Sequence, residues 1–152
     1  MAAVEQRLAE LGLTVPAVAA PVADYVPALR TGAYVYTSGQ LPFVDGELAV
    51  TGTVGAGVSL DEAASAARQC ALNAIAAVAS QVDLDEVVRV VKVVVFVASD
   101  PAFTDQPKVA NGASELIGQA FGEAGRHVRS AVGVAALPLG SPVEIEIVVE
   151  VG

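Results

Sequence analysis

Three carboxylates stand at alternating positions near the end of the chain. The segment 143–151 reads Val-Glu-Ile-Glu-Ile-Val-Val-Glu-Val, so a strand here would place Glu144, Glu146, Val148 and Glu150 on one face and only Val and Ile side chains on the other. That carboxylate face either lies in solvent, as on the outer side of an antiparallel sheet, or is covered by another subunit. A covered carboxylate needs a partner, because burying an unpaired charge is costly.

Arg129 is the best candidate for that partner. A guanidinium presents rigid donors that suit bidentate capture of a carboxylate. We expect a strand over 128–136 that pairs antiparallel with 143–151 across a turn at 137–142, which would bring Arg129 near the glutamates. A plain salt bridge at a strand end would use the same residues, and the spacing alone does not separate the two interpretations.

Other chemistries lack the residues that they require. His127 is the single histidine and is expected at the surface before a strand, and no spacing of Cys, His and Asp resembles a metal site. Cys70 falls inside a predicted helix, which is typical of a packed core residue. Ser38 lacks both the glycine pattern of a nucleophile elbow and an evident histidine base. We therefore expect a site of Arg, Glu, Tyr and backbone groups, with no metal and no cofactor.

The elements that must position these residues alternate between strands and helices. Helix periodicity covers 3–12, 60–81 and 105–122, and strand patterns cover 25–29, 33–38, 87–98, 128–136 and 143–151. Ser59 and Glu62 form a capping box at the start of the second helix. The strand 87–98 is apolar on both faces over its second half, so one helix layer cannot cover it. The order predicts an α+β fold with helices on one face of a mixed sheet.

Composition excludes several classes of protein. The chain has 152 residues, of which 54% are hydrophobic and 16% charged, so we expect one folded domain over 1–152, with 1–20 as an N-terminal helix and extended lead-in. A net charge of −9 argues against binding to nucleic acid or to an anionic membrane surface. A single cysteine and the absence of a signal-peptide pattern fit a cytoplasmic protein.

Several stretches, in order along the chain, resemble the RidA/YjgF family of reactive intermediate (enamine/imine) deaminases. They are Tyr34–Pro42 with its Ser-Gly-Gln-Leu-Pro run, Val94–Val97, Arg129-Ser130, Leu137-Pro138 and Val143–Glu146. The resemblance spans roughly residues 20–151. It implies a chorismate-mutase-like fold (β-β-α-β-α-β-β) assembled as a homotrimer. The sheets of three subunits would form a central barrel that covers the second sheet face, with active sites in the clefts between subunits.

The resemblance also implies a reaction and a set of site residues. The family hydrolyses reactive 2-imino or 2-enamino acids to 2-oxo acids and ammonia without a cofactor. Arg129 matches the arginine that binds the substrate carboxylate, and Glu144 matches the glutamate that holds or activates the hydrolytic water. The matching substrate-binding positions are Tyr25, Ser38, Gly39, Asn111 and Ala131. An arginine placed beside Glu144 would lower the pKa of its carboxyl.

Three departures indicate a longer branch of that family. Ala131 stands where the family commonly has cysteine, and the short members lack both the N-terminal helix and the extra residues near 104–108. Two other functions stay open: a non-catalytic trimeric protein that senses a small carboxylate through Arg129, and a ribonuclease, a label that family members have carried. Glu144 favours a hydrolase over a simple anion binder, and the charge of −9 argues against a ribonuclease.

Overall fold

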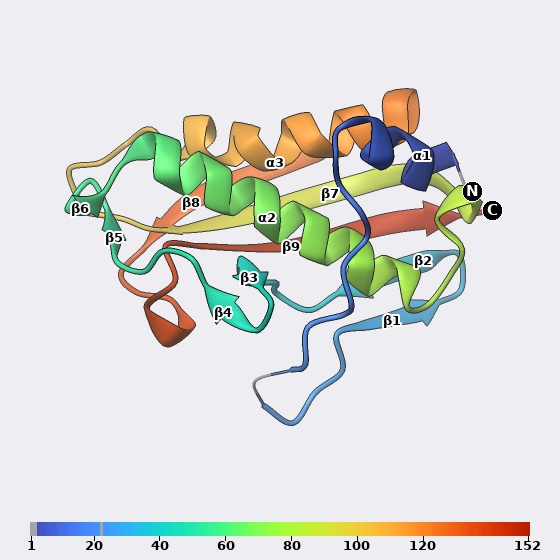
Figure 1. Cartoon of the computed structure of the whole chain (residues 1–152), viewed down its shortest axis with the longest axis horizontal. Helices are drawn as coiled ribbons and strands as arrows, with labels where there is room; N and C mark the ends of the chain where they lie inside the picture. Colours follow the sequence, from blue (N-terminus) through green and yellow to red (C-terminus); the bar gives the residue numbers. More distant parts are fainter. Residues whose placement is uncertain (1–2, 22) are drawn as a thin grey trace.

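The computed structural model describes residues 3–21 and 23–152. Its main sheet has five strands in the order β1-β2-β9-β7-β8, and α2 and α3 lie side by side on one face of it (Figure 1). The main elements are α1 (Ala3–Glu10), β1 (Ala28–Thr31), β2 (Tyr34–Thr37), α2 (Leu60–Ala79), β7 (Val87–Ala98), α3 (Gln106–Phe121), β8 (Val128–Val134) and β9 (Val143–Val151). The short ones are β3 (Phe43–Val44), β4 (Glu47–Leu48), β5 (Thr53–Val54), β6 (Gly57–Val58), η1 (Leu84–Glu86), η2 (Gly122–Gly125) and η3 (Pro138–Gly140). None of the helices in the described ranges is long and apolar enough to cross a membrane.

Most of the predicted elements are confirmed, with shifts at their ends. β7 and β9 match the predicted strands, and α2 begins at the predicted capping box, in which Ser59 and Glu62 exchange two hydrogen bonds of 3.1 Å. The strand predicted over 25–29 begins only at Ala28. The preceding residue, Pro27, has no N–H to offer to a β-ladder, and the chain bends before it.

The predicted pairing of the last two strands is wrong. β9 pairs antiparallel with β2 and β7, whereas β8 pairs parallel with β7 and is separated from β9 by that strand. The reason lies in the connection through α3. This helix returns the chain along the sheet after β7, so β8 starts at the same end as β7 and runs parallel to it.

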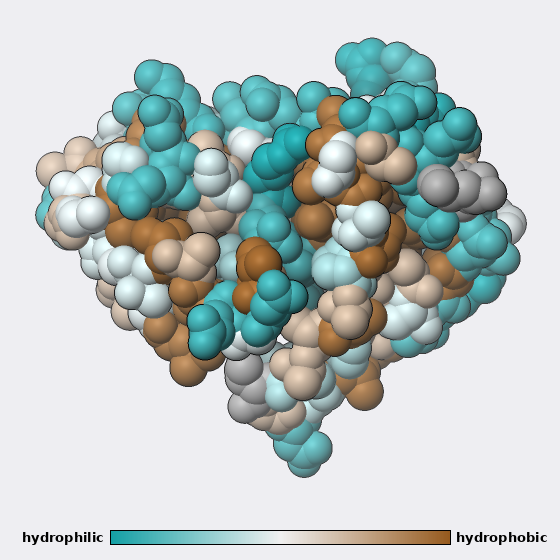
Figure 2. All heavy atoms as spheres, in the orientation of Figure 1, coloured by the Kyte–Doolittle hydropathy of each residue, from teal (hydrophilic) through white to brown (hydrophobic). Residues whose placement is uncertain are grey.

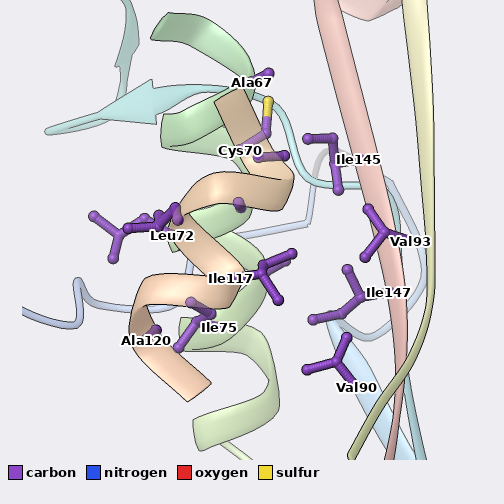
Figure 3. Packing of buried hydrophobic residues seen from close by; sticks show 14 of the residues in the cluster. Ala67, Cys70, Leu72, Ile75, Val90, Val93, Ile117, Ala120, Ile145 and Ile147 are labelled. Carbon is purple, nitrogen blue, oxygen red and sulfur yellow. The ribbon is translucent and has the colours of Figure 1, made fainter. Parts of the chain in front are cut away.

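The hydrophobic core lies between the helices and the sheet. Figure 3 shows side chains of α2 and α3, among them Ile75 and Ile117, facing those of β7 and β9. The odd-numbered residues of β9 point into this layer, as predicted, and are all at least nine-tenths buried. Cys70 is also fully buried there, and this burial raises the pKa of its thiol. The prediction that Cys70 is a packed core residue is therefore confirmed.

The other face of the sheet, here called the open sheet face, is not covered by any described element of the chain. It presents apolar side chains at alternate positions of all five strands: Leu29, Tyr34, Tyr36, Val94, Phe96, Val128, Val132 and Val148. Tyr36 is 45% exposed and Val132 is 44% exposed. By contrast, Figure 2 shows the helix-bearing side, where hydrophilic residues gather along the edge formed by α3. The expectation of a second apolar face without cover inside the chain is confirmed.

Candidate active site

Three of the predicted site residues, Tyr25, Gly39 and Glu144, line one pocket of about 60 Å³. We call it the Glu144 pocket. Its other walls are Ala19, Ala20, Pro21, Pro27, Gln40, Leu41, Phe43 and Pro138. The N-terminal segment thus contributes through its extended lead-in, whereas α1 itself packs against α3.

Gly39 allows the Glu144 carboxyl to lie directly against the backbone. Gln40 and Ile145 exchange two backbone hydrogen bonds of 2.7 and 3.0 Å, which hold the segment after β2 against β9. A Cβ at Gly39 would lie 2.7 Å from Cδ of Glu144 and 2.9 Å from its Oε1. Any side chain at residue 39 would therefore displace this carboxyl group.

The electrostatic environment of Glu144 differs from the expected one. Burial raises the pKa of its carboxyl, and the neighbouring charge of Glu146 raises it further. The expectation of a lowered pKa assumed that Arg129 lies beside Glu144, and within this chain it does not. Raising the pKa of a carboxylate makes it a stronger proton acceptor at a pH where it is still ionised.

Ser38 holds the segment that presents Tyr25. Its hydroxyl donates to the carbonyl of Val26 at 2.6 Å, and its N–H donates to the carbonyl of Pro27 at 2.8 Å. Ser38 and Tyr25 line a second, shallow hollow together, beside the Glu144 pocket. Tyr25 is 44% exposed, so its ring is available to a ligand or to another subunit. Within the chain, the Ser38 hydroxyl is engaged in this backbone bond.

A second group of predicted residues gathers around Arg129. Its Nη1 donates to Oδ1 of Asn111 at 2.9 Å, and its Nη2 lies 3.4 Å from the carbonyl oxygen of Pro107. The extra residues near 104–108 therefore contribute to this group, because they include Pro107. Ala131 is half-buried on the same side of β8, where it pairs with Val95.

These two groups do not meet within one chain. Arg129 pairs with Val93 and shares its helix-bearing face, whereas Glu144 pairs with Phe96 and lies on the open sheet face. With strands about 4.8 Å apart and a rise of about 3.3 Å per residue, the two Cα atoms are separated by roughly 14 Å. The expected contact between Arg129 and the β9 glutamates inside the chain is wrong, and so is the alternative of a salt bridge at the strand end, since Arg129 bonds to neutral groups.

Two polar residues near Arg129 were not identified as site residues from the sequence. Ser114 accepts a hydrogen bond from Nη1 of Arg129 at 3.1 Å, and its Oγ lies 2.9 Å from Nε2 of His127. His127 is half-buried rather than a free surface residue. Two spacings could have indicated this cluster: residues 127 and 129 are two apart at the start of β8, and residues 111 and 114 lie on one helix face.

The described residues offer no centre for a metal ion. In the ranges 3–21 and 23–152, no group of three or more His, Cys, Asp or Glu side chains is placed to hold one. Every fully buried side-chain nitrogen or oxygen in those ranges has a hydrogen-bond partner, so none is left pointing at a missing group.

Comparison with known proteins assigns the chain to a family. A family model described as "YjgF/chorismate mutase-like, putative endoribonuclease" matches residues 5–151. Protein TCP17 of Trypanosoma cruzi is 48% identical over 149 residues, which is 97% of this chain and 93% of that protein. The crystal structure of Atu1372 from Agrobacterium tumefaciens, of unknown function, is 46% identical with a TM-score of 0.90, covering 99% of this chain and 94% of that one. Escherichia coli TdcF with bound serine is 26% identical with a TM-score of 0.61, covering 92% and 95%.

Proposed function

Because the chain belongs to the YjgF/chorismate-mutase-like family, we propose that it hydrolyses reactive 2-imino or 2-enamino acids to 2-oxo acids and ammonia. The observation that carries this proposal is the Glu144 pocket, in which a half-buried carboxyl with a raised pKa lies against Gly39 and beside Tyr25. A proton acceptor in a small pocket suits the activation of one water molecule. Arg129 supplies the carboxylate-binding group.

The complete site forms between subunits of a homotrimer. Arg129 and Glu144 lie on opposite faces of the sheet, so one substrate can contact both only if they come from different copies. The open sheet face supports this assembly, because its exposed tyrosines and valines form an apolar surface that packing against other copies would cover. The edge strand β8 of one subunit, which carries Arg129, then lies against the Glu144 pocket of its neighbour.

The reaction requires few groups, because an iminium carbon is already electrophilic. Arg129 binds the substrate carboxylate and fixes the carbon in place. Glu144 accepts a proton from water as the oxygen bonds to that carbon, giving a tetrahedral adduct. Glu144 then returns this proton to the amine nitrogen, the C–N bond breaks with its electron pair leaving on ammonia, and the hydroxyl proton passes through Glu144 to that ammonia as the carbonyl forms. The products are a 2-oxo acid and ammonium, so atoms and charge balance without a cofactor.

A relative supports the substrate class. The crystal structure of TdcF contains bound serine, which has a carboxylate and a nitrogen on one carbon, as a 2-imino acid does. A ligand of this kind matches two groups of this chain: Arg129, which is cationic, and Glu144, which accepts a proton. Binding alone would also fit a non-catalytic carboxylate sensor, and the role of Glu144 separates the two functions, because a sensor needs no proton acceptor beside its anion.

The ribonuclease function implied by the family description has less support. A net charge of −9 opposes binding to a phosphate backbone, and the chain has a single histidine. In the described structure the ring of this histidine is hydrogen-bonded to Ser114 and to the carbonyl of Gly125. Failure to bind RNA at low salt would exclude this function.

The proposal is tested by generating 2-imino acids in situ with an amino-acid oxidase and trapping the remaining imine with semicarbazide. Wild-type protein should accelerate formation of the 2-oxo acid, and Arg129→Ala should abolish that acceleration. Arg126→Ala is the matched control, because Arg126 is an exposed arginine three residues away whose ion-pair partner is Glu123. Acceleration retained in Arg129→Ala, or absent from the wild type, would contradict the proposal.

A further inference from the structure

We propose that Ser114 and His127 are positioning residues that hold the Arg129 guanidinium ready for a substrate carboxylate. The inference rests on the proposed function, in which Arg129 binds that carboxylate. It comes from a continuous chain of hydrogen bonds that starts at the carbonyl of Gly125, passes through His127 and Ser114, and ends at Arg129. Neither positioning residue needs to touch the substrate.

The donors and acceptors of this chain fit one arrangement of protons. The carbonyl of Gly125 can only accept, so the His127 Nδ1 at 2.6 Å carries a proton. In the neutral ring Nε2 is then an acceptor, and it receives the hydroxyl proton of Ser114 at 2.9 Å. The lone pairs of Ser114 Oγ are thereby turned toward Arg129, whose Nη1 donates to it at 3.1 Å.

The backbone fixes both ends of the chain of hydrogen bonds. His127 directly precedes β8 and Arg129 is the second residue of that strand, and both side chains contact Ser114 on α3. On α3, Asn111 and Ser114 are three residues apart and share one helix face. A Cβ at Gly125 would lie 2.6 Å from the carbonyl oxygen of Ile117, so only glycine allows η2 to pack this closely against α3.

The remaining N–H groups of Arg129 are free for a ligand. A guanidinium has five, of which two on Nη1 bond to Asn111 and Ser114 and one on Nη2 points to Pro107. Within the part of the chain that the structure describes, the other two, one on Nε and one on Nη2, have no acceptor. Two such groups can take a carboxylate in a bidentate manner. Because the side chain is already ordered, binding costs less side-chain entropy than it would for a mobile arginine.

The test compares Ser114→Ala and His127→Ala with Ser114→Thr, which keeps the hydroxyl, and with Ser65→Ala, an exposed serine on α2. We expect the two alanine variants at 114 and 127 to raise the KM for imine hydrolysis and the Kd for 2-oxobutanoate about three- to tenfold. Their kcat should stay within about twofold, because the hydrolytic groups are untouched. Ser114→Thr should restore most of the affinity, and Ser65→Ala should match the wild type.

A second readout follows Arg129 directly by ¹⁵N NMR of the guanidinium and of the His127 ring. In the wild type, the Arg129 side-chain signals should be those of an ordered group and Nδ1 of His127 should be protonated; Ser114→Ala should mobilise the guanidinium. Unchanged Arg129 signals in Ser114→Ala and His127→Ala, or unchanged KM and Kd, would overturn the inference.

Failure of the proposed function can be told apart from failure of this inference. In that case the wild type would bind 2-oxobutanoate without hydrolysing imines, and the affinity and NMR comparisons would still decide the role of Ser114 and His127. A wild type that binds no 2-oxo acid would overturn the inference as well.

Discussion

Arg129 and Glu144 lie on opposite faces of the same sheet, on strands that are separated by β7. In the function that we propose, one chain therefore holds two half-sites rather than one complete site. Arg129 is ordered against α3 by neutral hydrogen-bond acceptors, whereas Glu144 lies in its own pocket against Gly39. The function that we propose requires a second copy of the chain to bring them together, and the predictions below follow from this arrangement.

Substituting Gly39→Ala should disable the Glu144 pocket while leaving the fold intact. The added Cβ would lie 2.7 Å from Cδ of Glu144, so the carboxyl must move away from its position. We expect kcat/KM for imine hydrolysis to fall by about two orders of magnitude. The control is Gly118→Ala on α3, where a Cβ meets nothing within 4 Å and helix stability should rise by about 1 kcal/mol. Equal activity of both variants would show that Glu144 does not need this position.

The pH dependence of hydrolysis should report the ionisation of Glu144. Its carboxylate must be ionised to accept a proton, so kcat should fall as the pH drops through the pKa of this carboxyl, which burial and the charge of Glu146 raise. Removing the neighbouring charge in Glu146→Gln stabilises the ionised form and lowers that pKa. The acid limb of the plot of kcat against pH, measured at saturating substrate, should therefore move to lower pH in Glu146→Gln. A limb that does not move, or moves to higher pH, would argue against Glu144 as the titrating group.

Loss of the Ser38 hydroxyl should affect stability and substrate affinity together. In Ser38→Ala the carbonyl of Val26 loses the donor that now lies at 2.6 Å, which should cost about 1 kcal/mol of unfolding free energy. The Tyr25 segment should loosen, and KM should rise more than kcat falls. Ser65→Ala, at an exposed helical position, provides the reference for denaturant unfolding and for kinetics. A Ser38→Ala protein as stable as this reference would contradict the assigned role.

A charge placed on the open sheet face should break the assembly. Val132 is 44% exposed there, opposite Phe96, so Val132→Asp should prevent packing against another copy. We expect the wild type to elute at about three times its chain mass of 15.3 kDa, and Val132→Asp to elute as a smaller species without hydrolytic activity. Leu11→Asp, which is also exposed but lies after α1, should leave the assembly unchanged. A trimer that survives Val132→Asp would place the interface elsewhere.

Local patterns in the sequence predicted local structure well. The alternation in Val143–Val151 indicated which side chains of β9 are buried, because a period of two decides the face directly. The capping box predicted the start of α2, because the two residues that form it, Ser59 and Glu62, are close in sequence.

Relations between distant segments could not be predicted in the same way. The neighbour of β8 depends on the path of the chain through α3, which alternation within a strand does not encode. The bond between Ser114 and His127 joins a helix to the start of a strand and depends on how closely η2 packs against α3. The resemblance to a known family identified Arg129 and Asn111, which the structure brings together, but not the Ser114 and His127 that lie behind them.

Mixing two inactive variants tests the shared site most directly. Arg129→Ala and Glu144→Gln are each expected to be inactive, and they are co-expressed with different tags so that mixed assemblies can be purified. If each site takes Arg129 from one copy and Glu144 from its neighbour in a trimer, one of the three sites of every mixed assembly contains both residues, which is about one third. The account predicts recovery of imine hydrolysis to about that fraction of wild-type activity. Mixed assemblies that remain as inactive as the parent variants would contradict it.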